Sequence, residues 1–146
     1  MKSIFLATPI SGFTDPVEYE SFRQNVIQLI AGLRLRYDVY CEIERVADAS
    51  DYDTPEESVI KDFGKIDQSD IFVMVHLKKC QTSALMELGY AFAKAKEIVL
   101  IGPKEKLPYM ALGLNVPGHP MSHIEVNELD EQSIRKICCS LGITEG

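Results

Sequence analysis

Apolar runs that alternate with amphipathic segments constrain the fold of this chain more than any other feature. The runs lie at residues 3–8, 37–43, 70–76, 98–101 and 121–126. Strands that alternate with helices form parallel sheets with right-handed crossovers. Five strands in 146 residues therefore predict a three-layer α/β fold of the flavodoxin-like (Rossmann-like) type. Its five-stranded parallel sheet has the expected order 2-1-3-4-5.

Four helices are predicted between and after these strands. Asp15-Pro16 opens the first, and Thr54-Pro-Glu-Glu57 is a capping box that opens the second, which runs to about Gln68. The third lies within residues 80–96, with Thr82 or Ser83 as its cap, and the fourth covers residues 130–141. The side chains expected to face the sheet are Phe22, Val26, Leu29, Ile30 and Leu33, then Val59, Ile60, Phe63 and Ile66, then Leu85, Leu88, Gly89, Phe92 and Ala93, and finally Ile134, Ile137 and Leu141.

Length and charge restrict the organisation and the partners of the chain. A chain of 146 residues is expected to form one domain, residues 1–146. Its net charge of −7 argues against binding to polymeric nucleic acid or to an anionic membrane surface. No apolar run approaches the roughly 18 residues needed to cross a bilayer. We therefore expect a cytoplasmic protein that acts on small molecules.

Neither the cysteines nor the histidines form a recognisable metal or disulfide pattern. The four cysteines, at positions 41, 80, 138 and 139, show no C-x-x-C spacing, and free thiols in a reducing compartment are expected. His119 and His123 are separated by Pro120 and have no third ligand nearby in sequence. The acidic loop at residues 47–53 lacks the glycine and the closing glutamate of a calcium loop, and is interpreted as a solvated loop. No metal and no cofactor are predicted.

A candidate site follows from the predicted strand order. In the order 2-1-3-4-5 the switch point lies between strands one and three, where ligands bind at the carboxyl edge. The loops at residues 8–13 and 77–83 would line that crevice. Glu87 would lie in the first turn of the helix that follows strand three, and Asp62 could reach the crevice from the second helix. The topology thus gathers Ser11, Gly12, Asp62 and Glu87 into one pocket.

The residues assembled in this way resemble the nucleoside 2-deoxyribosyltransferase family and its nucleotide N-glycosidase relatives. The likeness covers about residues 3–115 and rests on four features in the correct order. They are the strand and small-residue loop IFLATPISGF, Asp62 eight residues before Asp70, the block Ser83-Ala-Leu-Met-Glu87-Leu-Gly-Tyr-Ala-Phe-Ala93, and the lysine and apolar strand after it.

This resemblance implies an activity and a set of roles. Glu87 would be the nucleophile that attacks C1′ of the sugar, and Asp62 would hold or protonate the base, the logic of retaining glycoside hydrolysis. The substrate would be a nucleoside, nucleotide or dinucleotide, and the protein would be a homodimer or a higher homo-oligomer. The substrate contacts implied by the likeness are Phe5, Thr8, Ile10, Ser11, Gly12, Gln81, Thr82, Ser83 and Tyr90.

Departures from the family pattern refine this expectation. Phe5 stands where relatives often carry a tyrosine whose hydroxyl crowds the sugar 2′ position, which leaves room for a ribose 2′-OH. No arginine occupies the first loop, and no clear match exists for the asparagine that transferases lend to a neighbouring subunit. Plain N-glycosidic cleavage is therefore favoured over base transfer.

Other functions stay open on the sequence alone. One is a TIR-like NAD⁺ glycohydrolase, since such domains combine a flavodoxin-like architecture with glutamate-dependent attack at C1′. Another is a catalytically silent, nucleotide-binding sensor module, which the residues Phe5 and Gln81 would suit. A redox flavodoxin ranks low, because the first loop lacks a Thr/Ser-rich phosphate nest and the chain has no tryptophan to stack on a flavin.

Overall fold

The computed structural model describes residues 1–144 and contains one five-stranded sheet in the order β2-β1-β3-β4-β5. Every adjacent pair of strands is parallel. The predicted fold class and strand order are confirmed. The strands are β1 Ser3–Ala7, β2 Asp38–Tyr40, β3 Ile71–Val75, β4 Glu97–Ile101 and β5 Met121–Ile124, and the helices are α1 Pro16–Leu33, α2 Pro55–Gln68, α3 Ala84–Ala93 and α4 Glu131–Ser140.

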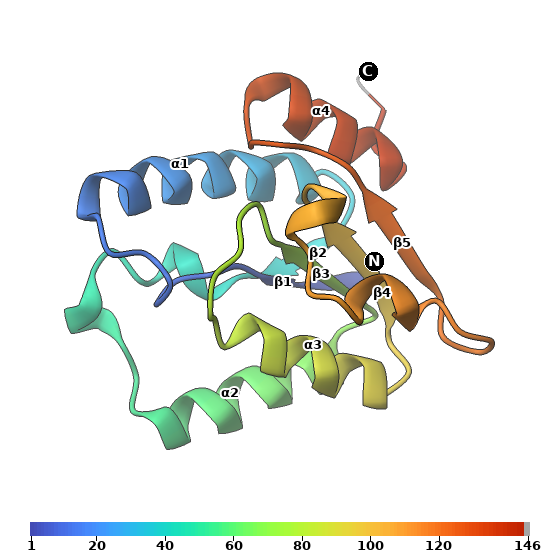
Figure 1. Ribbon diagram of the computed structural model, residues 1–146, viewed down its shortest axis with the longest axis horizontal. Coiled ribbons are helices and arrows are strands. Elements are labelled where there is room, and N and C mark those ends of the chain that lie inside the picture. Colours follow the sequence, from blue (N-terminus) through green and yellow to red (C-terminus); the bar gives the residue numbers. More distant parts are fainter. Residues whose placement is uncertain (145–146) are drawn as a thin grey trace.

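Helices cover both faces of the sheet and create two separate apolar cores. Helices α1 and α4 lie over one face, and α2 and α3 lie side by side over the other (Figure 1). Alternate residues of β1 face opposite sides, so Ile4 and Leu6 join the core under α1, whereas Phe5 and Ala7 join the core under α2 and α3. The central strand β3 is buried on both faces along its whole length.

The predicted helix starts are observed with their caps. Asp15 accepts a hydrogen bond from the Val17 amide at 2.9 Å, and Thr54 accepts one from the Glu57 amide at 3.2 Å. At α3 the cap residue is Ser83, but its hydroxyl makes no capping bond. The Thr82 hydroxyl accepts instead from the Ala84 amide at 3.3 Å.

Strand two and two helix faces differ from the expectation. The second strand ends at Tyr40, because the chain turns into a 3-10 helix at Glu42–Glu44. In α2, Val59 and Ile60 are exposed by 45% and 77%, because this half of the helix lies beside a cavity and not over the sheet. Gly89 and Ala93 of α3 are also exposed, since the buried stripe of that helix falls on Ala84, Leu88 and Ala91.

The segment between β4 and β5 is anchored although it contains little regular structure. It contains 3-10 helices at Lys104–Lys106 and Ala111–Leu114. Leu107 and Ala111 are buried in the core under α2 and α3. These two side chains fix the segment against the carboxyl edge of the sheet.

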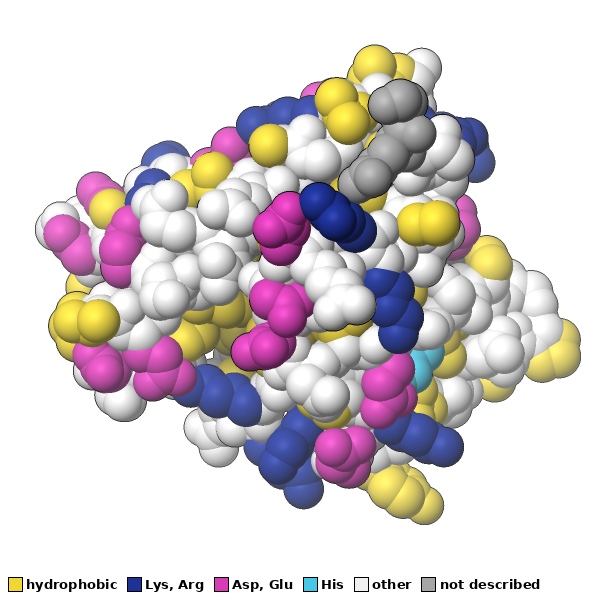
Figure 2. Space-filling model, turned by 90° about the horizontal axis from the view of Figure 1, so that it is seen from above, with side chains coloured by type: hydrophobic (Ala, Val, Ile, Leu, Met, Phe, Trp, Pro, Cys, Tyr) yellow, Lys and Arg dark blue, Asp and Glu magenta, His cyan; other side chains and the backbone are white. Residues whose placement is uncertain are grey.

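The surface carries charges of both signs. Seen from the side of α1 and α4, acidic and basic side chains are interspersed (Figure 2). Among residues 1–144, no helix has the length and apolar character needed to cross a membrane. The four cysteines are free thiols; Cys41 and Cys138 are buried and Cys139 is exposed.

Candidate active site

A cavity of about 160 Å³ opens at the carboxyl edge of the sheet, at the predicted switch point between β1 and β3. Its walls come from the end of β1 and the loop after it, from residues 42–58, from the middle of α2 and from the start of α3. The lining residues are Phe5, Leu6, Ala7, Thr8, Ile10, Ser11, Glu42, Val46, Tyr52, Asp53, Ser58, Asp62, Thr82, Ser83, Ala84 and Glu87.

Two carboxyl groups meet in this cavity. Asp62 from α2 and Glu87 from the first turn of α3 are hydrogen-bonded to each other through their side chains. Two carboxylates cannot share a hydrogen bond unless one of them holds a proton. Asp62 Oδ1 is buried and receives no hydrogen bond from any donor within residues 1–144. The pair is therefore a site at which one proton is held between two acids.

The electrostatic environment keeps that proton bound at neutral pH. Burial, the hydrogen bond to Asp62 and the negative charges of Asp62 and Glu42 together raise the pKa of Glu87 to about 9. Burial is also the main reason why the pKa of Asp62 is raised. Because the two groups are coupled, the raised pKa values belong to the pair and not to one member. One negative charge and one exchangeable proton are what an acid and a nucleophile need to work together.

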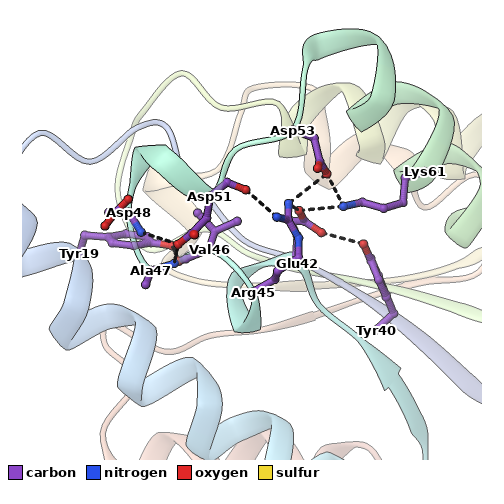
Figure 3. Close-up of polar contacts among 10 residues, drawn as sticks. All are labelled: Tyr19, Tyr40, Glu42, Arg45, Val46, Ala47, Asp48, Asp51, Asp53 and Lys61. Carbon is purple, nitrogen blue, oxygen red and sulfur yellow. Dashed lines mark hydrogen bonds and ion pairs between the residues drawn. The ribbon is translucent and has the colours of Figure 1, made fainter.

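A second acidic pair in the same wall is neutralised by cations (Figure 3). Lys61 contacts both Glu42, at 3.0 Å, and Asp53, and Arg45 also contacts both, at 3.0 Å from Asp53. The Tyr40 hydroxyl donates to Glu42 Oε2 at 2.7 Å. Burial alone would raise the pKa of Glu42, but hydrogen bonds from Tyr40, Arg45 and Lys61 outweigh it and lower that pKa. Glu42 and Asp53 are thus fixed as carboxylates.

The loop that carries this wall is tied to the rest of the fold. The Tyr19 hydroxyl of α1 donates to the Val46 carbonyl at 2.6 Å, and Arg45 donates to the Asp51 carbonyl at 2.5 Å. Asp51 accepts from the backbone amides of Ala47 and Asp48 at 2.9 and 3.2 Å, as Figure 3 shows. The loop at residues 47–53 is mainly exposed to solvent, as the sequence predicts, and its Tyr52 and Asp53 line the cavity.

Eight of the residues named from the sequence come together in the cavity. They are Phe5, Thr8, Ile10, Ser11, Asp62, Thr82, Ser83 and Glu87. Gly12 and Gln81 lie in a shallower hollow next to it, which shares Ser11, Thr82 and Ser83 with the cavity and also includes Lys79.

Tyr90 lies apart from both the cavity and the hollow. Its ring stacks on Phe63 with the centroids 4.3 Å apart, and its hydroxyl donates to Asp67 at 2.8 Å. These contacts join α3 to α2. A role for Tyr90 in substrate binding stays a prediction.

Four polar lining residues were not anticipated: Glu42, Tyr52, Asp53 and Ser58. The sequence predicts a strand at Glu42, a loop at Tyr52 and Asp53, and a helix start at Ser58. The clustering of acids and tyrosines at residues 40–53 was the available signal, but nothing local shows that this segment folds over the end of β1.

Within residues 1–144, no group of three or more His, Cys, Asp or Glu side chains is arranged to hold a metal ion. His119 stacks on Phe92 at 4.4 Å, and His123 contacts the Gly102 carbonyl at 2.7 Å. The acids of the cavity either contact Lys61 and Arg45 or contact each other.

Comparison with known proteins gives structural but not sequence matches. No family model matches the chain, and no curated protein matches it significantly. The Clostridium botulinum CMP N-glycosidase BcmB has a similar structure, with a TM-score of 0.71 at 19% identity over 98% of this chain and 100% of that chain. BlsM, solved in solution, gives 0.70 at 21% identity over 96% of this chain and 91% of that chain.

A flavodoxin-like domain from Synechococcus sp. is a more distant structural match. Its TM-score is 0.57 at 17% identity over 97% of this chain and 94% of that chain. At these identities the matches establish the flavodoxin-like fold of this chain, over nearly its whole length.

Proposed function

We propose that this protein is an enzyme of the nucleoside 2-deoxyribosyltransferase-like group that cleaves the N-glycosidic bond of a nucleoside or nucleotide. Glu87 is the nucleophile and Asp62 is the acid and base. The observation that carries the proposal is the contact between these two carboxyl groups, which are partly buried in a cavity at the switch point of the sheet and form no ion pair within residues 1–144. The structural likeness to a CMP N-glycosidase over both whole chains supports it.

The pair can carry out the first half of the reaction with the proton that it holds. Substrate entry replaces the contact between the carboxyls, and the proton passes from Glu87 to Asp62, which leaves Glu87 ionised. An oxygen of Glu87 attacks C1′, the C1′–N bond breaks, and its electron pair goes to the base, which takes the proton from Asp62. The products are a glycosyl ester on Glu87, the free base and an ionised Asp62.

Water completes the cycle with the roles reversed. Asp62 accepts a proton from a water molecule, and the water oxygen attacks C1′ of the ester. The bond from C1′ to Glu87 breaks and returns its electron pair to the carboxylate. The free sugar is released with retained configuration, and the pair again holds one proton and one negative charge.

The remaining lining residues suit a ribose with a 5′-phosphate. Phe5 is 2% exposed, lines the cavity and stacks on Phe72 at 5.7 Å, so its ring offers a flat apolar floor without a hydroxyl. A ribose 2′-OH fits such a floor. The start of α3 and the Ser83 hydroxyl, which makes no capping bond, offer donors for phosphate oxygens.

We assign hydrolysis rather than base transfer, because the sequence offers no clear match for the asparagine that transferases contribute from a neighbouring subunit. The four free thiols suit a cytosolic protein.

We also propose a homo-oligomer. Val59 and Ile60 of α2 and Met86 of α3 are exposed by 45%, 77% and 63% on two adjacent helices beside the cavity. Covering these apolar side chains with the same surface of a second copy would bury them. Sedimentation analysis is expected to give a dimer or larger species that Ile60→Asp converts to monomer; a wild-type monomer at micromolar concentration would contradict this.

Chromatography tests the activity. A mixture of ribonucleosides, deoxyribonucleosides, their 5′-monophosphates and NAD⁺ is incubated with the wild type and with Glu87→Ala. We expect free base from a ribonucleoside or its monophosphate with the wild type only. Nicotinamide as the sole product would indicate an NAD⁺ glycohydrolase. Ligand-induced thermal stabilisation without any base release would indicate a silent binding module, and equal release by both proteins would exclude Glu87.

A further inference from the structure

A second and larger cleft lies on the other side of the loop that leads into α3. Its volume is about 680 Å³, and it is formed by the ends of β3 and β4 and by the segment that follows β4. The lining residues are His76, Lys79, Cys80, Leu85, Lys104, Glu105, Lys106, Leu107, Pro108, Tyr109 and Leu112. Asp62 and Glu87 line the other cavity and not this cleft. The proposed reaction therefore does not use the cleft.

The rim of this cleft is cationic in a protein whose net charge is −7. Lys79, Lys104 and Lys106 are exposed, and within residues 1–144 none of them forms an ion pair. Lys61, Lys78 and Lys94, by contrast, each contact a carboxylate. Glu105 is the one acid in the lining. The rim therefore offers two net positive charges, which match a dianion.

The floor of the cleft is apolar and fixed. Leu107 is 6% exposed and belongs to the core under α2 and α3, and Leu85 and Leu112 pack against the same core. The Lys106 amide donates to the Pro103 carbonyl at 3.0 Å, which holds the short helix that bears the lysines. Tyr109 is fully exposed at the edge. An aromatic or other apolar body fits this floor.

A buried histidine in the wall is incompletely paired. His76 is 2% exposed, and its ring is hydrogen-bonded to the Lys106 backbone, whereas Nδ1 is buried and has no partner within residues 1–144. Its own amide donates to the Ile101 carbonyl at 2.8 Å, so β3 and β4 hold it in place. A buried polar atom left unpaired is destabilising, and each one in a folded protein needs an explanation such as a bound ion, a water molecule or a functional role. This is an observation independent of the lysines.

We propose that this cleft is a binding site for an organic phosphate, that is, a dianionic phosphate ester with an aromatic or apolar body. Lys79, Lys104 and Lys106 bind the phosphate as point charges, and Leu85, Leu107 and Leu112 contact the body. Lys79 and Cys80 also line the hollow next to the catalytic cavity. The occupied cleft thus contacts the loop that leads to Thr82 and Ser83.

Three probes separate the two halves of this ligand. The full chain is titrated with 1-naphthyl phosphate, with 1-naphthol and with inorganic phosphate at low ionic strength, and binding is followed by calorimetry and by amide ¹H–¹⁵N spectra. We expect 1-naphthyl phosphate to bind once per chain and at least about ten-fold more tightly than either part. The amide shifts are expected at residues 76–80 and 104–112.

Charge variants test the rim. Lys104→Gln/Lys106→Gln is expected to weaken binding of 1-naphthyl phosphate at least about five-fold, and Glu105→Gln to strengthen it by about two-fold or more. Lys2→Gln/Lys136→Gln removes the same charge from exposed positions outside the cleft and is expected to change the affinity by less than about two-fold. Equal weakening by both double variants, shifts confined to the Asp62–Glu87 cavity, or no saturable binding would overturn the proposal.

Discussion

Two pairs of acidic side chains share one cavity, and the fold treats their charges in opposite ways. Glu42 and Asp53 contact Lys61 and Arg45, and the pKa of each is lowered, for Asp53 chiefly by its hydrogen bond to Lys61. Asp62 and Glu87 contact each other and, within residues 1–144, form no ion pair with a cation; the pKa of each is raised, chiefly by burial. The first pair is a fixed part of the wall, whereas the second can exchange a proton.

The difference shows how a cavity with four acids can perform acid–base chemistry at neutral pH. Glu42 and Asp53, which are paired with Lys61 and Arg45, keep their negative charge and hold the loop that forms the wall of the cavity. Their negative charge also disfavours ionisation of the second pair, because Glu42 raises the pKa of both Asp62 and Glu87. Lys61 and Asp62 are adjacent in α2, so one turn of helix supplies a cation to one pair and an acid to the other.

Removing the nucleophile is expected to have the largest effect. Glu87→Gln keeps the shape of the side chain but cannot attack C1′, so the rate of base release should fall at least about 10³-fold. Product chromatography measures it. Glu97→Gln, an exposed position at the start of β4, is the matched control and should keep full activity. Residual activity within ten-fold of the wild type would remove Glu87 from the mechanism.

Removing the acid should have a smaller effect on the rate. Asp62→Asn eliminates the proton donor to the base, and a loss of about 10²–10³-fold is expected. The pKa of Glu87 should also fall, because burial continues to raise it but the hydrogen bond to Asp62 and the negative charge of Asp62 are lost. The rate should therefore become less sensitive to pH above 7. An unchanged pH profile would show that the two groups do not titrate together.

Because the pKa of Glu87 is raised, the Glu87→Gln variant, which should lose activity, is expected to be more stable than the wild type at alkaline pH. The folded state keeps a proton, up to a pKa of about 9, that the unfolded chain releases near 4.5. The free energy of unfolding of the wild type should therefore fall as pH rises from 4.5 towards 9. Glu87→Gln, with no proton to lose, should be more stable by about 2 kcal/mol at pH 8 and equal near pH 4. Urea unfolding at both pH values measures the difference, and a destabilised Glu87→Gln at pH 8 would contradict it.

Adding a hydroxyl to the cavity floor should change sugar preference. Phe5→Tyr places an oxygen where a ribose 2′-OH would lie, so kcat/KM for ribonucleosides relative to deoxyribonucleosides should fall about ten-fold. The Phe5 ring lies 5.5 Å from Tyr40 and 5.7 Å from Phe72, so Phe72→Tyr, on the neighbouring strand, is the matched control. An equal change in both variants would attribute the effect to the core.

Weakening the ion pairs of Glu42 and Asp53 should lower the free energy of unfolding but have little effect on the rate of base release. Lys61→Met leaves Glu42 and Asp53 with Arg45 alone, and a loss of about 1 kcal/mol is expected at pH 7, a small figure because Lys61 is one-third exposed. The pKa of Glu42 is lowered in the folded state, so this loss should vanish as pH falls below about 4. Base release should stay within about five-fold. A loss of activity above 10²-fold at unchanged stability would make the two pairs one functional unit.

The sequence predicts those parts of the fold that depend on local pattern. Alternating apolar runs and capping residues such as Asp15 and Thr54 predict the strand order and the helix starts. It also places Asp62 and Glu87 near one crevice, because parallel strands end at the same edge. These inferences need only periodicity and topology.

Contacts between distant segments were beyond the sequence. Strand β2 is shorter than predicted, because the chain turns into a 3-10 helix at Glu42, whose carboxylate pairs with Lys61. The two residues are nineteen positions apart, and nothing in the local sequence indicates that they pair. Val59 and Ile60 follow the helical apolar pattern, yet they are exposed because this half of α2 lies beside the cavity. The direct contact between Asp62 and Glu87 likewise depends on the packing of α2 against α3.

One titration tests the contrast between the two pairs directly. Protein with ¹³C-labelled glutamate carboxyls is followed by NMR from pH 3 to pH 10, with the signals of Glu42 and Glu87 assigned by Glu42→Gln and Glu87→Gln. We expect Glu42 to ionise below the ordinary glutamate range, because of its hydrogen bonds from Tyr40, Arg45 and Lys61, and Glu87 to keep its proton through pH 7 and lose it near 9. If Glu87 instead titrates near 4.5 and Asp62, with its carboxyl labelled in the same way, titrates in the ordinary aspartate range, the pair holds no proton at neutral pH and the proposed chemistry is wrong.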